Sequence, residues 1–254
     1  MHKLTVTLAL LVLGLSKMCA QIVNIESLRN DNDTSAFKGI ENFNANYKQN
    51  TRELFTLNNQ LAIQIKKAKN SWLLLNNVDV ELAQGQSLEQ NLLFHARYNR
   101  RLSQKFDAEV YSQYQKNVPL KISDRVLLGA GVRWAIQKKE KAKVTYGLST
   151  LYEYEREMIN PIIHNAVRLS NYLSLTLQSK KTSWSSVVYY QPRIDWWEDY
   201  RVSLQTKLEL KFNADWSFTS NLSFNIDSKP VVDASIPNQT IKWLNGLTYR
   251  FKKE

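Results

Sequence analysis

The chain has 254 residues and a net charge of +11, with 43% hydrophobic, 11% aromatic and 22% charged residues. This composition excludes a disordered polyelectrolyte, and only seven Gly and five Pro exclude a collagen-like or Gly-linker protein. The single Cys excludes a disulfide scaffold and any zinc site built from cysteines, and the length suits one large all-β domain or two small ones.

The first twenty residues have the three parts of a secretory signal peptide. A short basic start precedes an apolar run of 12 residues (4–15), and the small residues Cys19 and Ala20 end the segment. We predict cleavage before Gln21. The apolar run is too short for a membrane-spanning helix of ~20 residues. Lipid attachment at Cys19 is less favoured, because the preceding residues lack the required Leu-small-small pattern.

The predicted mature chain contains no cysteine and keeps a net charge of +9, because the signal peptide removes Lys3 and Lys17. A cysteine-free exported chain fits an oxidising compartment. Export argues against nucleic acid as the partner of the basic charge. No later apolar stretch approaches 18 residues, so no spanning helix is expected. We interpret the polar segment 21–35 as a periplasmic tail or a plug.

From residue 54 onward the sequence alternates between apolar and polar residues, the pattern of β-strands with two different faces. Tyr200, Val202, Leu204, Thr206, Leu208, Leu210 and Phe212, for example, alternate with a charged and polar set. The pattern predicts twelve strands at about 37–47, 53–66, 71–83, 87–99, 104–115, 123–137, 142–155, 162–177, 183–192, 200–212, 215–227 and 240–251. Most are long enough for tilted membrane strands of ~9–11 residues.

The predicted connections alternate in length. One set is short and polar (67–70, 100–103, 138–141, 178–182 and 213–214), and the other includes the longer stretches 116–122, 156–161, 193–199 and 228–239. Two further connections of the second set, 48–52 and 84–86, are short. Outer-membrane barrels have short periplasmic turns and longer outer loops. With twelve strands, both termini would then lie in the periplasm.

Aromatic residues of the apolar face gather at both strand ends. Those expected near the inner turns are Trp72, Tyr98, Phe106, Trp134, Trp184, Phe212, Trp216 and Phe251, and those near the outer loops are Tyr114, Tyr154, Tyr190 and Tyr200. An aliphatic band between two aromatic girdles suits a bilayer with wet interfaces. A soluble sandwich has no reason to sort its aromatics in this way.

These patterns predict an all-β fold: a closed antiparallel up-and-down transmembrane β-barrel of about 12 strands over residues 36–251, followed by the tail 252–254. An open sheet edge in hydrocarbon would leave unpaired backbone groups that cost several kcal/mol each. We therefore expect the last strand to pair with the first. Outer-membrane lipid, lipopolysaccharide and the barrel-assembly machinery are the expected partners.

Two stretches carry a family resemblance. The run 123–134, with Asp124-Arg125 followed by Gly129-Ala130-Gly131 and Trp134, resembles the central strand of the salt-induced outer-membrane protein family, a domain of unknown function in Gram-negative bacteria. The closing runs 225–230 and 247–251 are similar too. The resemblance covers roughly Phe37 to Phe251 and implies an outer-membrane barrel with no established reaction or ligand.

The sequence departs from the family pattern at two places. Gln49-Asn50-Thr51 stands where a Gly-Asn-Thr turn is expected, and Lys252-Lys253-Glu254 follow the final aromatic residue, where barrel proteins often end. The second departure concerns the recognition of the C-terminus by the barrel-assembly machinery.

The inward face carries charges of both signs. By alternation, the expected wall residues are Lys66, Asp79, Glu81, His95, Arg97, Lys105, Asp107, Glu109, Arg125, Arg133, Lys143, Glu153, His164, Arg168, Arg201, Lys207, Glu209, Lys211, Lys242 and Arg250. They would line either a mildly basic pore that favours anions or a closed interior filled by cross-strand ion pairs. Twelve strands lie between filled and open barrels, and we favour a narrow or plugged interior. Gly129 and Gly131 are expected to relieve crowding.

Neither a catalytic site nor a cofactor or metal site is predicted. After signal cleavage only His95 and His164 remain as histidines, and no Ser, His and orienting group are placed together on the lipid face, where a phospholipase would need them. Two distant histidines with carboxylates make a weak metal site. No phosphate-binding or nucleophile-elbow motif occurs.

The loop 193–199 contains the adjacent Trp196 and Trp197 beside acidic residues. They could bind a sugar or a partner. We favour the alternative that one anchors in the membrane interface while the other packs beneath neighbouring loops. The loop 228–239, with Pro230 and Pro237, is interpreted as a stiff lid.

The leading functional hypothesis is a non-enzymatic outer-membrane barrel that is a narrow or plugged channel or an envelope-integrity protein. The alternatives are a barrel enzyme acting on membrane lipid and a surface receptor for a glycan or protein ligand.

Overall fold

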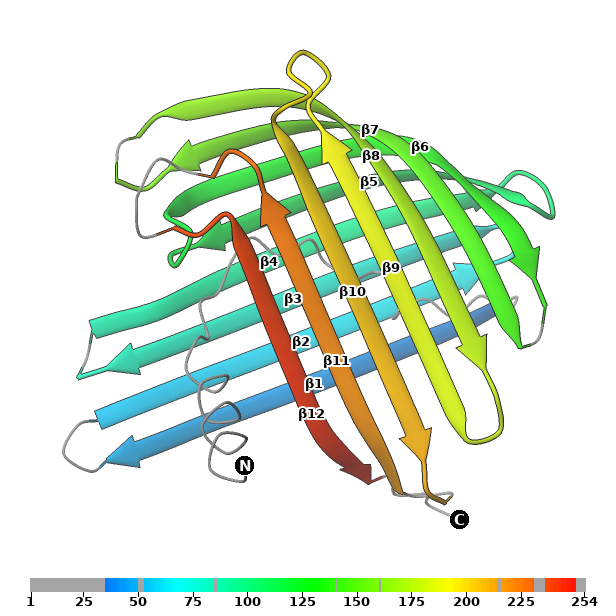
Figure 1. Cartoon of the computed structure of the whole chain (residues 1–254), viewed down its shortest axis with the longest axis horizontal. Helices are drawn as coiled ribbons and strands as arrows, with labels where there is room; N and C mark the ends of the chain where they lie inside the picture. Colours follow the sequence, from blue (N-terminus) through cyan, green and yellow to red (C-terminus); the bar gives the residue numbers. More distant parts are fainter. Residues whose placement is uncertain are drawn as a thin grey trace, which may run out of the picture.

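In the part of the chain that the structure describes, twelve antiparallel strands form one sheet in which each strand pairs with its neighbours in sequence (Figure 1). This computed structural model describes residues 35–49, 53–84, 86–139, 141–159, 161–213, 216–230 and 236–249. The strands are β1 (Ser35–Gln49), β2 (Glu53–Lys67), β3 (Asn70–Ala83), β4 (Gln86–Arg101), β5 (Phe106–Asn117), β6 (Ile122–Lys138), β7 (Ala142–Glu157), β8 (Ile163–Gln178), β9 (Thr182–Pro192), β10 (Tyr200–Lys211), β11 (Trp216–Asp227) and β12 (Gln239–Tyr249). The strand count and order predicted from the sequence are confirmed, with bounds that agree within two residues.

The predicted signal peptide (1–20), nearly all of the polar segment 21–35 and the tail 252–254 lie outside the described residues. So do Arg250 and Phe251. None of the described residues forms a helix long and apolar enough to cross a membrane.

Polarity is reversed relative to a soluble protein. Large apolar side chains along the strands are exposed, including Leu128 (53%), Val132 (47%) and Leu173 (50%). Arginine and glutamate side chains are buried instead, as in Arg125 (4%) and Glu153 (2%). Because side chains alternate along each strand, one face of the sheet is an apolar outer surface and the other is a polar interior.

The apolar surface has aromatic side chains near both strand ends. At one end Trp72 packs on Tyr98 with ring centroids 5.6 Å apart, and Phe106 stacks on Trp134 at 6.0 Å. At the other end Tyr190 packs on Tyr200, also at 6.0 Å. These girdle pairs join neighbouring strands and leave aliphatic side chains between them, as the sequence predicted. Phe251 lies outside the described residues.

The connections alternate between the two ends of the sheet because every strand reverses direction. We call the end with the β2–β3, β4–β5, β6–β7, β8–β9 and β10–β11 connections the turn end, and the opposite end the loop end. Ala68 and Gln84 adopt positive φ angles of 52° in two of the tightest reversals. The first residue of β1 and the last of β12 both lie at the turn end, since Ser35 pairs with Lys67 and Tyr249 with Trp216.

The sheet curls strongly, so that strands distant in order face each other across its concave side (Figure 1). Side chains on β10 reach β7 across the interior, although β8 and β9 separate these two strands in the sheet. Most of the side chains buried in this interior are polar or charged, and small apolar clusters such as Ala62, Leu73 and Leu75 lie among them.

Closure of the barrel differs from the expectation. Among the described residues, β1 pairs only with β2 and β12 only with β11, so the sheet is open at this seam. Apolar side chains beside the seam are accordingly very exposed, as in Phe37 (71%) and Leu247 (67%). The sequence of β1 offers a reason, because Glu41 interrupts its apolar positions. A strand with weak alternation specifies its register weakly against a new neighbour.

Candidate functional site

The interior near the loop end contains a buried cluster of charges centred on Glu153 of β7. Three guanidinium groups meet its carboxylate: Arg168 Nε lies 2.6 Å from Oε2, Arg125 Nε lies 3.2 Å from Oε1, and Arg201 Nη1 also contacts Oε1. The side chains of Glu153, Arg125 and Arg168 are at most 5% exposed. We call Arg125, Glu153, Glu155, Arg168 and Arg201 the Glu153 cluster.

Further carboxylates pair with the arginines of the cluster. Arg125 Nη2 lies 2.5 Å from Glu155 Oε2, and Arg201 Nη2 lies 3.2 Å from the same oxygen. Arg201 Nε lies 2.9 Å from Asp227 Oδ2, and Arg168 Nη2 lies 2.9 Å from Asp199 Oδ1. Three arginines therefore face four carboxylates. Buried charges persist only with such pairing, because desolvation of each ion is costly.

Strand register explains most of these contacts. Arg125 of β6 lies directly opposite Glu155 of β7, and Arg201 of β10 lies opposite Asp227 of β11. Glu153 and Glu155 share one face because they are two residues apart on one strand. The contact between Arg201 and Glu153 depends on the curl of the sheet, which no local pattern encodes.

A second buried group occupies the middle of the interior. Arg97 Nη1 lies 3.1 Å from Glu109 Oε2, and the Arg97 guanidinium lies over the Tyr111 ring, 4.6 Å from its centroid. The Tyr111 hydroxyl lies 2.9 Å from Ser149 Oγ of β7. Tyr172 and Tyr189 pack together nearby, with ring centroids 5.3 Å apart.

Two glycines make room for these rings. A Cβ at Gly129 would lie 2.2 Å from the Tyr111 ring, and one at Gly147 would lie 2.0 Å from the Tyr172 ring. A Cβ at Gly131 would meet Leu148 O at 2.3 Å. The expectation that Gly129 and Gly131 relieve crowding is confirmed. The Tyr111 and Tyr172 rings therefore occupy the space over the paired glycines of the neighbouring strands.

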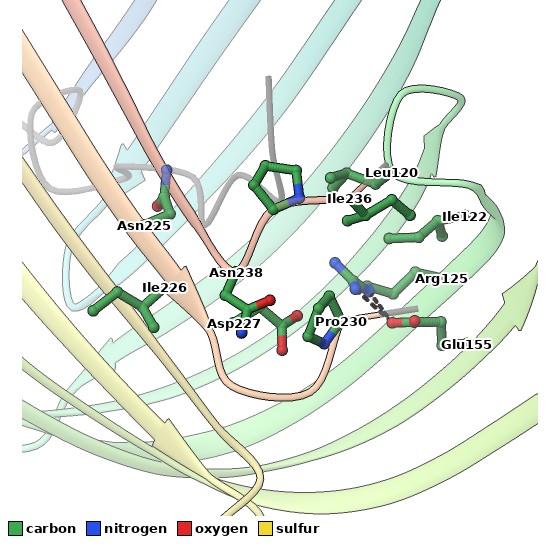
Figure 2. Close-up of a pocket in the computed structure, with 11 residues that line it drawn as sticks. Leu120, Ile122, Arg125, Glu155, Asn225, Ile226, Asp227, Pro230, Ile236 and Asn238 are labelled. Carbon is green, nitrogen blue, oxygen red and sulfur yellow. Dashed lines mark hydrogen bonds and ion pairs between the residues drawn. The ribbon is translucent and has the colours of Figure 1, made fainter. Parts of the chain in front are cut away.

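An apolar cap lies over the Glu153 cluster at the loop end. Leu120 of the β5–β6 connection and Ile122, the first residue of β6, pack with Ile236 of the β11–β12 connection, and all three are at most 7% exposed. Figure 2 shows these side chains beside the Arg125–Glu155 ion pair. The adjoining cavity is about 20 Å³, room for about one water molecule. We call Leu120, Ile122 and Ile236 the cap.

The sequence from residue 41 to residue 251 matches a family described as a protein of unknown function, DUF481. The chain belongs to this family. No curated protein matches it. The expected membership of a family of unknown function is thus confirmed, whereas the description of the family as salt-induced stays a prediction.

Three solved structures are similar to this DUF481 chain in fold. The KdgM porin is 13% identical over 85% of this chain and 100% of that chain, with a TM-score of 0.45. The NanC porin is 8% identical over 85% and 100%, with a TM-score of 0.48. The translocator domain of the autotransporter NalP from Neisseria meningitidis is 9% identical over 89% and 92%, with a TM-score of 0.43. Identities this low do not transfer a function.

The structure places the other expected wall residues along the interior without gathering them into one site. Asp79 is half-buried and accepts hydrogen bonds from Asn58 (3.0 Å) and Asn77 (2.7 Å). Arg133 lies 3.7 Å from Asp107 near the turn end. Glu81 and Glu209 are half-buried, and Lys207 is exposed.

The two histidines lie in separate parts of the molecule. His95 is buried in β4, and its Nδ1 lies 3.1 Å from Gln113 Oε1. His164 is the second residue of β8 at the loop end, where its half-exposed ring lies 2.8 Å from Glu157. Among the described residues, no three His, Cys, Asp or Glu side chains form a group that could hold a metal.

The loop 193–199 differs from the interpretation of its tryptophans. Trp196 and Trp197 are 44% and 57% exposed, so neither packs beneath a neighbouring loop. Lys229 Nζ lies 4.8 Å from the centre of the Trp196 ring. The loop is instead held by polar contacts, because the Arg193 guanidinium donates hydrogen bonds to Asp195, which lowers the pKa of that carboxyl.

Sequence reasoning missed three carboxylates of the charge cluster. Glu155, Asp199 and Asp227 were absent from the expected wall, although Glu155 and Asp227 follow the same alternation as their neighbours. Extending the inward set to the ends of β7 and β11 would have found two of them. Asp199 lies in a loop, where alternation carries no signal.

Proposed function

We propose that this protein is a closed, twelve-stranded outer-membrane β-barrel with a plugged interior and a non-enzymatic role in the envelope. The observation that carries the proposal is the reversed polarity: exposed Leu128, Val132 and Leu173 surround buried arginines and glutamates. Exposed apolar surface on this scale needs lipid around it. The girdle pairs at both strand ends suit the two interfaces.

Closure follows from the same solvent argument. Hydrocarbon offers no hydrogen bonds to the free edges of β1 and β12, and each unpaired backbone group there costs several kcal/mol. The curl of the sheet already brings distant strands to face each other. The predicted signal peptide and the arrangement of both sheet ends at the turn end support a periplasmic turn end.

A plugged interior is favoured over an anion-selective pore. The arginines that would attract anions are paired with carboxylates, and the cap covers the cluster at the loop end. Tyrosine rings occupy the middle of the interior. A wall of neutralised charges beneath an apolar cover offers little path for hydrated ions.

Conductance of the purified, refolded protein in a planar bilayer tests this function. We expect insertion without steady current. A steady anion-selective current would replace the plugged barrel with a pore. Recovery of the protein from the periplasm rather than from the outer-membrane fraction would overturn the location itself.

Surface recognition is the second candidate role, because Trp196 and Trp197 are adjacent in sequence at the loop end and are both exposed. A glycan screen comparing the wild type with a Trp196→Ala, Trp197→Ala variant tests it. Binding lost only in the variant would support a receptor, and identical profiles would remove that role.

A further inference from the structure

Charge is distributed unevenly between the two ends of the sheet. The five turn-end connections (68–69, 102–105, 139–141, 179–181 and 212–215) contain six basic and two acidic residues. The six loop-end connections (50–52, 84–85, 118–121, 158–162, 193–199 and 228–238) contain four basic and four acidic residues. The net positive charge of the connections therefore lies at the turn end.

A hollow of about 650 Å³ lies among the basic turns. Four cationic side chains line it: Lys69 of the β2–β3 turn, Arg101 and Lys105 beside the β4–β5 turn, and Lys138 at the end of β6. We call it the basic hollow. Its volume is in the range of ligand-binding pockets.

Backbone hydrogen bonds fix the frame of the basic hollow. Arg101 N donates to Lys69 O at 2.8 Å, and Ala135 N donates to Lys105 O at 2.7 Å. Inside the turn, Leu102 N donates to Phe106 O at 2.9 Å. The three elements that supply the cations are thus tied to one another, so their charges are held together before any ligand binds.

Positive charge in the basic hollow is poorly compensated. Arg101 lies 3.8 Å from Asp107, and its side chain stays 44% exposed. Within the described part of the chain, Lys69, Lys105 and Lys138 form no ion pair with a carboxylate, and all three are exposed. Three ammonium groups are therefore available to an anion from outside.

One border of the basic hollow is apolar. Leu102 and Ile136 line it and are 58% and 45% exposed. Next to them on the same outer face lies the stacked Phe106–Trp134 pair of the girdle. The hollow thus joins a cationic region to the start of the apolar band, a combination that fits a molecule with an anionic head and a hydrocarbon tail.

We propose that the basic hollow binds the phosphate group of an anionic phospholipid in the leaflet that faces the turn end. The lipid tail would run along Leu102 and Ile136 toward the girdle. A choline headgroup would place its own positive charge among the lysines, so a net-negative headgroup is favoured. This inference rests on the proposed membrane location.

Competition between lipids in native mass spectrometry of the refolded protein tests the proposal. The probes are dioctanoyl phosphatidylglycerol, dioctanoyl phosphatidylcholine and glycerophosphoglycerol, which is the first headgroup without its chains. We expect the wild type to bind the phosphatidylglycerol about tenfold or more tightly than the other two. A Lys69→Gln, Lys105→Gln, Lys138→Gln variant should lose this preference.

The matched control is Lys48→Gln, Lys116→Gln, Lys229→Gln, which removes the same charge at the loop end and should keep the preference. Equal affinity for both lipids, or equal losses in both triple variants, would overturn the proposal. If glycerophosphoglycerol binds as tightly as dioctanoyl phosphatidylglycerol, the basic hollow is a site for soluble anions and not for a lipid. Insertion of the wild type into vesicles of phosphatidylcholine alone tests the membrane location separately from the lipid site. Failure to insert would contradict the proposed membrane location, whereas insertion without a lipid preference would contradict only the basic hollow.

Discussion

Single residues on the two faces of one strand should tolerate charge very differently. Leu204 of β10 faces outward beside the exposed Val188, whereas Gln205 faces the interior and is 6% exposed. Leu204→Arg should cost ~2–4 kcal/mol of folding free energy if it lies at mid-bilayer, and Gln205→Arg should cost less. Urea unfolding of the protein refolded in lipid vesicles measures both. Equal costs would contradict the assignment of the faces.

The centre of the buried charge cluster should be the residue most sensitive to loss of charge. Glu153→Gln keeps the side-chain shape but leaves Arg125, Arg168 and Arg201 around a neutral group. Removing one charged partner of a buried ion pair lowers the free energy of unfolding by about 3–5 kcal/mol. The same urea titration should show this loss.

The control for Glu153→Gln is Asp195→Asn, which breaks the exposed ion pair with Arg193 and should leave the unfolding midpoint unchanged. A small effect of Glu153→Gln, similar to that of the control, would mean that water reaches the cluster freely. In that case the interior would be a wet channel and not a plug.

Among the structural elements, the strands follow from local sequence and the cap does not. Alternation fixed the bounds of β10, because each step along 200–212 changes face and polarity together. Ile236 offers no such signal, since its partners Leu120 and Ile122, at the start of β6, are far away in the sequence. The same limit applies to Arg201 and Glu153, whose contact depends on curvature and not on register.

The packing of Ile236 against Leu120 in the cap can be tested by cysteine labelling. In the predicted mature chain, which has no other cysteine, Ile236→Cys should react slowly with a membrane-impermeant maleimide on whole cells, because Ile236 is 7% exposed. Adding Leu120→Ala should speed the reaction several-fold, because it removes the packing partner. Ile194→Cys, at a residue that is 42% exposed, is the fast-reacting reference. Rapid labelling of Ile236→Cys without the second change would show that the cap is not closed.

At the scale of the whole molecule, we expect the open seam between β1 and β12 to close when the protein lies in a bilayer. The two strands run antiparallel if they meet, because β1 starts at the turn end and β12 ends there. A cysteine at Ala45 should therefore form a disulfide with a cysteine at an outward-facing position in the middle of β12, such as Trp243 or Asn245, because paired residues point to the same face. Scanning these positions is needed because the weak alternation of β1 leaves its register open.

Crosslinking must appear in outer-membrane fractions to support closure, and it should be absent when Ala45→Cys is paired with Asn171→Cys of β8. Disulfides require Cα atoms within about 7 Å, so a crosslink reports direct strand neighbourhood. If no position on β12 crosslinks while the protein is fully inserted, two free edges must be covered in another way. A second copy of the chain pairing edge to edge would then be the physical alternative, since hydrocarbon leaves unpaired strands no other partner.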